Sequence, residues 1–302
     1  MKEKFQFLQQ FPLKLLAIVF MTLDHVGAMM TNEIYFALGS SPYTVGFVFR
    51  CIGRLAFPLF IFFLAEGLNK THDRLNYVLR LALMWAGISV AEIIIQAIRP
   101  ELVLPAEAFT DLLMYALFIY FIEHKKKPLK LLALLPLAYI GLSYACDFSE
   151  TYAALNAQTS VWSSFFPQFL RSGYSVYGFV MLLGIYYAPK VVNYFFKRTI
   201  EASPDVEIDM GEWTSGPRYQ GLLNAITNSV IIITTLIFWL IERTSGIYVF
   251  DMGVQTWCLL ACALIFCYNG QRGHDKKWFR YFEYLYYPVH LVLIFGLFAI
   301  FF

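Results

Sequence analysis

The chain has 302 residues, of which 59% are hydrophobic, 19% aromatic and only 15% charged, and its formal net charge is +2. Soluble domains carry roughly 25% charged residues, so this composition excludes a soluble or disordered protein, and so small a net charge gives no basic surface for nucleic acid. We therefore predict an integral membrane protein, with membrane lipid as its first partner.

Membrane-spanning helices are the predicted elements of this chain. Each needs about 20 mostly apolar residues, with roughly 17 to 25 acceptable. In chain order, the segments that fit, although the fourth is short, are 12–30, 44–68, 77–98, 109–123, 130–147, 174–196, 221–242, 249–268 and 282–302. No soluble domain, internal repeat or low-complexity tract separates them. The predicted fold class is therefore all-α, a polytopic transmembrane helix bundle of about nine spans that forms one domain over residues 1–302.

The lysines and arginines predict how this bundle is oriented. Loops on the cytoplasmic side of a membrane protein are enriched in these residues. With nine spans and the N-terminus inside, 18 of the 23 lysines and arginines fall in inner segments, three fall in outer loops and two lie within the second span. We therefore expect the N-terminus inside, the C-terminus outside and a multi-pass location in the cell membrane, which in a bacterium is the cytoplasmic membrane.

Ionisable side chains lie inside several predicted spans, where each costs about 2.5–3.5 kcal/mol on insertion scales and so indicates a function. The first span carries Asp24 and His25, the second carries Arg50 and Arg54, and the last carries His290. At a rise of about 1.5 Å per residue, the groups of the first two spans reach a similar depth on the outer side of the bilayer midplane. Arg50 and Arg54 are four residues apart on one helical face, so they can hold an anion or pair with Asp24.

These residues have a structural explanation as well as a functional one. In the structural explanation, neutralising Arg54 is the whole role of Asp24, and each histidine is an interior side chain with its hydrogen bonds satisfied. An aspartate–histidine pair opposite two arginines favours the functional explanation, with His25 as a general base that Asp24 orients. The five histidines show no metal-ligand spacing such as HExxH, so no metal site is predicted.

Two basic turns at the predicted inner face form a second candidate site. Arginine and lysine bind phosphates, and glycine in the same turns permits close approach of the backbone. The residues concerned are Lys70, Arg74 and Arg80 after the second span, and Asn269, Arg272 and Lys276 after the eighth. They are candidate contacts for a phosphorylated cofactor, and the alternative is that they only satisfy the topology bias.

Several of these residues occur in short motifs that resemble those of a known family. The motifs are LDHVG at residues 23–27, RCIGRLAFP at 50–58, EG at 66–67 with THDR at 71–74, YNG at 268–270 with RG at 272–273, and YPVHL at 287–291. In order and spacing they resemble the TraX family of conjugative-pilin acetylases. The motifs lie toward the two ends of the chain, and the middle, residues 95–170 and 197–255, shows no comparable match.

The resemblance implies a function. The family is similar to membrane acyltransferases that use an acyl-CoA on the cytosolic side to modify an acceptor reached from the other side, which makes acetyl-CoA the expected acyl donor. It implies that His25, with Asp24 beside it, is the essential histidine of the first span. Arg50 and Arg54 then correspond to the family's arginine pair, and His290 to its last-span histidine. The assignment of CoA phosphates to the basic turns is our own inference from charge and side.

The expected activity is transfer of an acetyl group from cytosolic acetyl-CoA to an amine or hydroxyl reached from the outer side, such as a protein N-terminus or a glycan. In this scheme His25 is the general base, a role worth typically 10²–10⁴-fold, and Arg50 or Arg54 stabilises the oxyanion. An acetyl-histidine intermediate is an open alternative. The rival from another class is an ion- or proton-coupled transporter that uses the same charges as a relay. A membrane scaffold, in which the buried charges are dispensable, is the third possibility.

Overall fold

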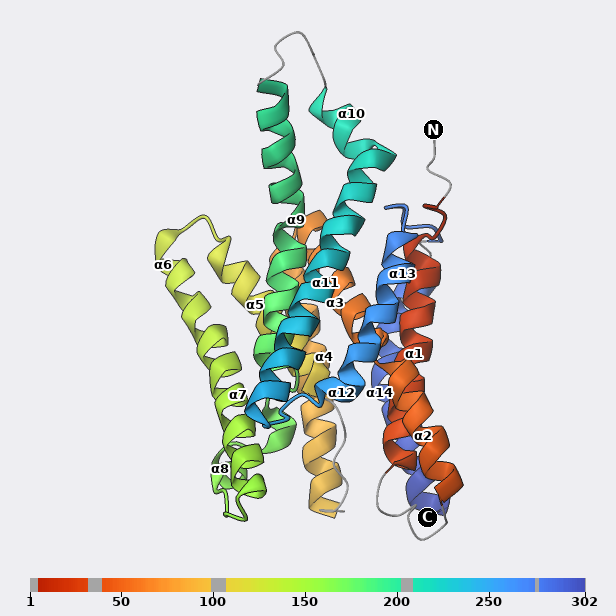
Figure 1. Ribbon diagram of the computed structural model, residues 1–302, viewed down its shortest axis with the longest axis vertical. Coiled ribbons are helices and arrows are strands. Elements are labelled where there is room, and N and C mark those ends of the chain that lie inside the picture. Colours follow the sequence, from red (N-terminus) through yellow and green to blue (C-terminus); the bar gives the residue numbers. More distant parts are fainter. Residues whose placement is uncertain (1–4, 32–39, 99–106, 202–208, 275–276, 302) are drawn as a thin grey trace.

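Helices account for the regular secondary structure in the part of the chain that the structure describes (Figure 1). The computed structural model describes residues 5–31, 40–98, 107–201, 209–274 and 277–301. Within these ranges the only strand-like contact is an isolated bridge between Leu8 and Tyr268. The all-helical class predicted from the sequence is therefore confirmed. Lys276, one of the predicted phosphate contacts, lies outside the described residues.

Most predicted spans coincide with one long helix, and short helical pieces connect or extend them. In chain order the elements are α1 (Gln10–Met30), α2 (Ser40–Gly53), α3 (Ala56–Lys70), α4 (Arg74–Ile98), α5 (Glu107–Ile122), α6 (Lys127–Lys130), η2 (Leu131–Ala133), α7 (Leu134–Leu155), α8 (Trp162–Phe165), η3 (Gln168–Leu170), α9 (Ser175–Glu201), α10 (Met210–Ser215), α11 (Pro217–Ser245), α12 (Met252–Gln255), η4 (Thr256–Leu260), α13 (Ala261–Phe266) and α14 (Lys277–Phe301). The long helices run roughly along the long axis of the bundle (Figure 1).

Six helical segments of the described chain are long and apolar enough to cross a membrane. They are Gln10–Met30, Thr44–Lys70, Arg74–Ile94, Lys127–Leu155, Gln168–Thr199 and Pro217–Ser245. The other three predicted spans fall on shorter apolar helices, at Ala108–Ile122, Met252–Phe266 and Leu285–Ile294. A membrane helix bundle is therefore supported, whereas the number nine and the orientation of the termini stay predictions.

The second predicted span is two helices, α2 and α3, joined at Arg54 and Leu55. The backbone N–H of Arg54 still donates to the carbonyl of Arg50, at 3.1 Å, so the helical turn continues up to the break. Pro58 lies in the first turn of α3, where its missing N–H costs no helical hydrogen bond. The break therefore occurs at the arginine pair and places Arg54 at a corner between the two helices.

Glycines bring α1 and α2 into backbone contact. A Cβ added to Gly27 would lie 2.6 Å from the carbonyl oxygen of Gly46, and one added to Gly53 would lie 2.3 Å from the Cβ of Asp24. Membrane helices commonly use small residues in this way, because they let two backbones approach closely. The close approach sets Asp24 of α1 directly beside the end of α2 that carries the arginines.

Replacing Gly53 by alanine should therefore separate α1 from α2. The added methyl would lie 2.5 Å from the Cα of Asp24, and neither backbone can yield without moving its helix. We expect the free energy of unfolding to fall by about 1–3 kcal/mol, the usual cost of overpacking. Gly87→Ala in α4 is the matched control, because nothing lies within 4 Å of its added Cβ. Equal melting temperatures of the two variants in detergent would contradict the close packing.

Candidate functional site

Helices α1 and α14 run in parallel and are joined by polar contacts at three heights. The first contact is an ion pair, the second joins two hydroxyls and the third joins two imidazoles. In order along both helices they are Lys14 Nζ–Glu283 Oε2 at 2.9 Å, Thr22 Oγ1–Tyr286 Oη at 2.7 Å and His25 Nδ1–His290 Nε2 at 2.8 Å. The predicted first-span and last-span histidines are therefore direct neighbours, although 265 residues separate them in sequence.

The hydrogen bonds of the two histidines fix their tautomers when both rings are neutral. The Nδ1 of His290 lies 3.0 Å from the carbonyl oxygen of Tyr286, which can only accept, so this nitrogen carries the proton. The Nε2 of His290 then has a lone pair and accepts from the Nδ1–H of His25. His25 is left with a lone pair on Nε2, which has no hydrogen-bond partner among the described residues. Both side chains are buried, at 6% and 4% exposure, so the arrangement presents one oriented base.

The carboxylate of Asp24 pairs with the two arginines and not with His25, its neighbour in sequence. Its Oδ2 accepts from Arg50 Nη1 at 2.8 Å, and its Oδ1 lies 3.7 Å from Arg54 Nε. The predicted ion pairing of Asp24 with the arginine pair is present in the structure. The partner that orients His25, however, is His290, because the carboxylate of Asp24 is taken up by Arg50.

Tyr174 is a site residue that the sequence analysis missed. Its hydroxyl accepts from Arg54 Nη1 at 3.0 Å, and its ring stacks on Phe57 with centroids 3.5 Å apart. Its backbone N–H donates to Asp111 Oδ2 at 2.9 Å, and the other oxygen of Asp111 accepts from the N–H of Ser175 at 3.0 Å. The buried Asp111 therefore holds the start of α9 in place, and through Tyr174 it positions Arg54. With 20 tyrosines in the chain, no sequence signal distinguished this one.

A cavity of about 220 Å³ contains His25, and we refer to it as the His25 cavity. One stripe of α1 lines it, with Lys14, Ile18, Met21 and His25 at helical spacing. From Lys14 to His25 the stripe is about 16 Å long. The Lys14 side chain is 28% exposed, so this end of the cavity approaches the surface, and the histidine end is buried. The His25 cavity therefore has a polar end at Lys14, an apolar middle and a buried base, His25, at its other end.

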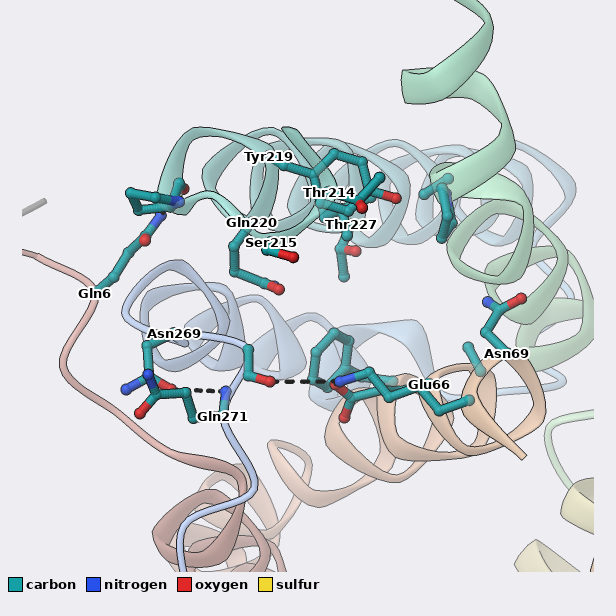
Figure 2. Close-up of a pocket in the computed structure, with 18 of the residues that line it drawn as sticks. Gln6, Glu66, Asn69, Thr214, Ser215, Tyr219, Gln220, Thr227, Asn269 and Gln271 are labelled. Atoms are coloured by element: carbon teal, nitrogen blue, oxygen red, sulfur yellow. Dashed lines mark hydrogen bonds and ion pairs between the residues drawn. The ribbon is translucent and has the colours of Figure 1, made fainter. Parts of the chain in front are cut away.

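A larger cavity of about 620 Å³, the Glu66 cavity, lies between the end of α3 and the start of α11. Figure 2 shows Glu66 and Asn69 on one wall and Gln220 and Thr227 on the wall opposite. Lys70 and Asn269, both predicted cofactor contacts, line it as well. The cavity lies at the end of the bundle where α1 begins, and polar side chains contribute to its lining. The sequence analysis predicts that this end is cytosolic.

The carboxylate of Glu66 is the most heavily hydrogen-bonded group of this cavity. It accepts from Lys70 Nζ at 2.6 Å, from the Tyr268 hydroxyl at 2.6 Å and from Gln10 Nε2 at 2.7 Å. The fully buried hydroxyl of Tyr268 is the donor to this carboxylate. Glu66 thus ties α1, α3 and the loop after α13 together.

The two cavities lie on opposite faces of α3, with Asn69 lining the larger one and Phe60 the smaller one. Glu66 lines the larger one and bonds to Gln10, while Lys14, one helical turn further along α1, lines the smaller one. Leu13 of α1 and Leu68 of α3 are both fully buried in the hydrophobic core. The two cavities share no lining residue, so a molecule that occupied both would have to pass α3.

The other predicted phosphate contacts lie outside the Glu66 cavity. The Nε of Arg74 donates to the carbonyl of Leu68 at 3.2 Å, and the Nε of Arg80 donates to that of Asn76 at 3.1 Å. Arg272 is exposed on the loop that follows Asn269. The structure therefore brings Lys70 and Asn269 into one cavity and leaves the three arginines outside it, Arg74 half-buried and Arg80 and Arg272 exposed.

The chain matches the model of a known protein family. The family model described as TraX protein matches residues 9–188. The matched region holds α1 to α8 and half of α9, and so includes the histidine of the first span, the arginine pair and Tyr174, but not His290. No curated protein and no solved structure matches the chain.

Proposed function

The chain belongs to the TraX family, and from this premise we propose that it is a membrane acetyltransferase that uses acetyl-CoA as the acyl donor. The acceptor is an amine or hydroxyl reached from the outer side, such as a protein N-terminus or a glycan, and the enzyme works in the cytoplasmic membrane of a bacterium. The observation that carries the proposal is the oriented, buried His25 Nε2 in a cavity that extends to Lys14. The contact between His25 and His290 also joins α1 to α14, but the lone pair left on His25 Nε2 suits proton abstraction from an acceptor.

In this proposal each cavity binds a different part of acetyl-CoA. The nucleotide half lies in the Glu66 cavity, where Lys70 contributes charge and Asn269 a hydrogen-bonding amide. Arg74, Arg80 and Arg272 add positive charge on the surface nearby, and Lys276 belongs to the same basic turn in sequence. Three of the predicted contacts thus act at long range on the phosphates and two act within the cavity.

The acyl arm passes the Gln10–Glu66 contact and runs along the α1 stripe from Lys14 to His25. The pantetheine arm is long enough to cross about half a bilayer, about 15 Å, and the stripe is about 16 Å long. The two lengths agree, so the thioester reaches the histidine when the phosphates lie close to Lys14, at the edge of the Glu66 cavity nearest α1. Because the two cavities lie on opposite faces of α3, this passage needs α3 to part from a neighbouring helix when the donor binds.

In the transfer itself, His25 Nε2 accepts the proton of the acceptor as its nitrogen or oxygen bonds to the thioester carbon. The carbon–sulfur bond then breaks and the thiolate leaves. His290 stabilises the imidazolium that forms by accepting the Nδ1–H of His25. Arg54, held by Tyr174, offsets the negative charge on the carbonyl oxygen, and Arg50 keeps Asp24 ionised. An acetyl group carried transiently on His25 Nε2 is the alternative route.

The direct test is to incubate the purified protein with isotopically labelled acetyl-CoA and a membrane extract, and to identify labelled molecules by mass spectrometry. We expect one dominant product that is absent without the protein. If the buried charges served ion or proton transport, or only assembly, no labelled product would form. That result would refute the acetyltransferase proposal.

Replacing Lys70 by glutamine should weaken CoA binding. A hydrogen bond to a charged group contributes about 1.5–3 kcal/mol, so we expect the dissociation constant to rise about tenfold or more. The constant can be measured from the thermal stabilisation of the protein by rising CoA concentrations. Lys130→Gln is the matched control, because Lys130 is an exposed lysine of α6 outside both cavities. The same dissociation constant in both variants would remove Lys70 from the donor site.

A further inference from the structure

The Glu66 cavity has a buried, mostly apolar floor and a polar mouth. Phe62 of α3 and Ile185 and Ala188 of α9 line the floor, at 6%, 4% and 1% exposure. Lys70 and Ser215 line the cavity as exposed residues, and they belong to its mouth. A volume of about 620 Å³ lies within the usual range of small-molecule sites, about 300–1,000 Å³. A ligand of this cavity would therefore place its least polar part on the floor and its charged part at the mouth.

A proline frees one backbone acceptor on this floor. Pro189 lies inside α9 and has no N–H, so the carbonyl of Ile185, four residues earlier, has no helical donor at the usual spacing. The next carbonyl, that of Tyr186, accepts from Asn69 Nδ2 of α3 at 3.0 Å. No side chain of the described residues donates to the carbonyl of Ile185. Because Ile185 and Pro189 both line the cavity, this carbonyl is an acceptor for whatever occupies it.

Thr227 of α11 supplies a buried hydroxyl on the same floor. It is 2% exposed, lines the cavity and makes no hydrogen bond to another residue in the described ranges. In Figure 2 its side chain extends from α11 toward the wall that carries Glu66. By contrast, Thr244 of the same helix donates to the carbonyl of Leu240 at 2.8 Å. Since buried polar groups are normally hydrogen-bonded, the Thr227 hydroxyl is a second group that the fold leaves to a ligand.

The close approach of α9 and α11 places these two groups at a similar height on facing helices. A Cβ added to Gly184 would lie 2.6 Å from the side chain of Val230, so the two antiparallel helices touch there (Figure 1). From this contact toward the start of α11, Thr227 lies three residues away, about 4.5 Å. The carbonyl of Ile185 lies one residue past Gly184 and is directed the same way, since helix carbonyls point toward the C-terminal end. An acceptor-only group and a hydroxyl therefore lie together on the floor.

We propose that this floor binds the adenine base of the nucleotide. The carbonyl of Ile185 accepts from the exocyclic amine, and the hydroxyl of Thr227 donates to the neighbouring ring nitrogen. An amine beside an unprotonated ring nitrogen is the pattern that such a pair recognises, and adenine and cytosine carry it, whereas guanine and hypoxanthine have an oxo group in place of the amine. Of these bases CoA carries adenine, whose flat ring suits the apolar floor and leaves the phosphates toward Lys70.

The identification of the nucleotide as CoA rests on the proposed acetyltransferase function. The preference for an amine over an oxo group rests on the floor of the cavity alone, so the two can be tested separately.

The test is binding of adenosine 3′,5′-bisphosphate, which carries the base, the ribose and two of the phosphates of CoA, to the purified full-length protein. Thermal stabilisation during a titration measures the affinity. Inosine 3′,5′-bisphosphate is the matched ligand, because its base carries the oxo group. We expect the wild type to bind it with an affinity lower by about tenfold or more, since two acceptors would then face each other on the buried floor. Equal affinity for the two nucleotides, or binding of neither, would overturn the proposal.

Three variants and a control assign the preference to the two groups. Thr227→Val removes the hydroxyl and should weaken binding of the adenosine nucleotide about three- to tenfold, and Thr227→Ser should restore it. Thr234→Val is the matched control, because Thr234 is a buried threonine of the same helix that lines neither cavity. Pro189→Ala supplies the missing N–H and should reduce the preference for adenosine over inosine, because a helical hydrogen bond then occupies the carbonyl of Ile185.

The outcomes separate this site from the enzymatic function. An equal loss of affinity in Thr227→Val and Thr234→Val, or an unchanged preference in Pro189→Ala, would overturn the adenine site even if the wild type transfers acetyl groups. Absence of acetyl transfer by a protein that prefers the adenosine nucleotide would refute the enzymatic function and leave the adenine site standing.

Discussion

Replacing His25 by alanine should lower the rate of acetyl transfer by about 10²–10⁴-fold, the usual contribution of a positioned general base. We expect a large effect because two hydrogen bonds orient His25. His290 Nδ1 donates to the carbonyl of Tyr286 and His290 Nε2 accepts from His25 Nδ1, which leaves the lone pair of His25 on Nε2. No other described histidine lines the His25 cavity. Binding of CoA should change little, since Lys70 and Asn269 lie in the other cavity. Single-turnover transfer of labelled acetyl groups and a CoA titration measure the two effects.

The control for this variant is His72→Ala. His72 is exposed between α3 and α4 and lines neither cavity, so its loss should leave both the rate and CoA binding unchanged. Transfer at the wild-type rate by the His25 variant would exclude it as the base. Loss of CoA binding in parallel with the rate would instead indicate that the substitution damages the fold.

Replacing Asp24 by asparagine should destabilise the protein strongly. Arg50 and Arg54 would keep their charges, with side chains only 27% and 12% exposed, and lose the one carboxylate among the described residues that lies within 4 Å of both. Breaking a buried ion pair from one side typically costs about 3–5 kcal/mol, and the partial exposure of Arg50 favours the lower end. The free energy of unfolding in detergent micelles, from denaturant titration, measures this cost.

A matched ion pair provides the comparison for Asp24. The carboxylate of Glu123 accepts from Lys190 Nζ at 2.7 Å and from the Tyr187 hydroxyl at 3.0 Å. Because Lys190 is 57% exposed, solvent screens this pair, and Glu123→Gln should cost less than about 1 kcal/mol. Similar costs for the two variants would mean that the arginine cluster is far better solvated than its burial indicates.

The helices and the ion pair between Asp24 and the two arginines could be predicted from the sequence because both depend on local pattern. Apolar runs of about 20 residues predict spans whatever their neighbours. The spacing of Arg50 and Arg54, at the estimated depth of Asp24, predicted that the three would meet, and the 2.8 Å contact between Arg50 and Asp24 is present. Depth along a helix can be counted from sequence, and so contacts between consecutive spans can be predicted.

Contacts between distant helices had no such signal. No periodicity relates α1 to α14, so the pairing of His25 with His290 could not be predicted, and Asp24 was the nearer partner to expect. Arg74 was predicted from charge alone, which gives no indication that its guanidinium bonds to the backbone of the preceding turn.

The central claim is that an acyl group carried by CoA reaches the His25 cavity, and S-bromoacetyl-CoA tests it most directly. This analogue places an alkylating carbon next to the thioester carbonyl, where a nucleophile displaces bromide and becomes covalently attached. We predict that peptide mass mapping finds the label on His25 and that excess CoA prevents the labelling. Labelling only of residues outside the cavity, or labelling of His25 that CoA does not prevent, would contradict the account.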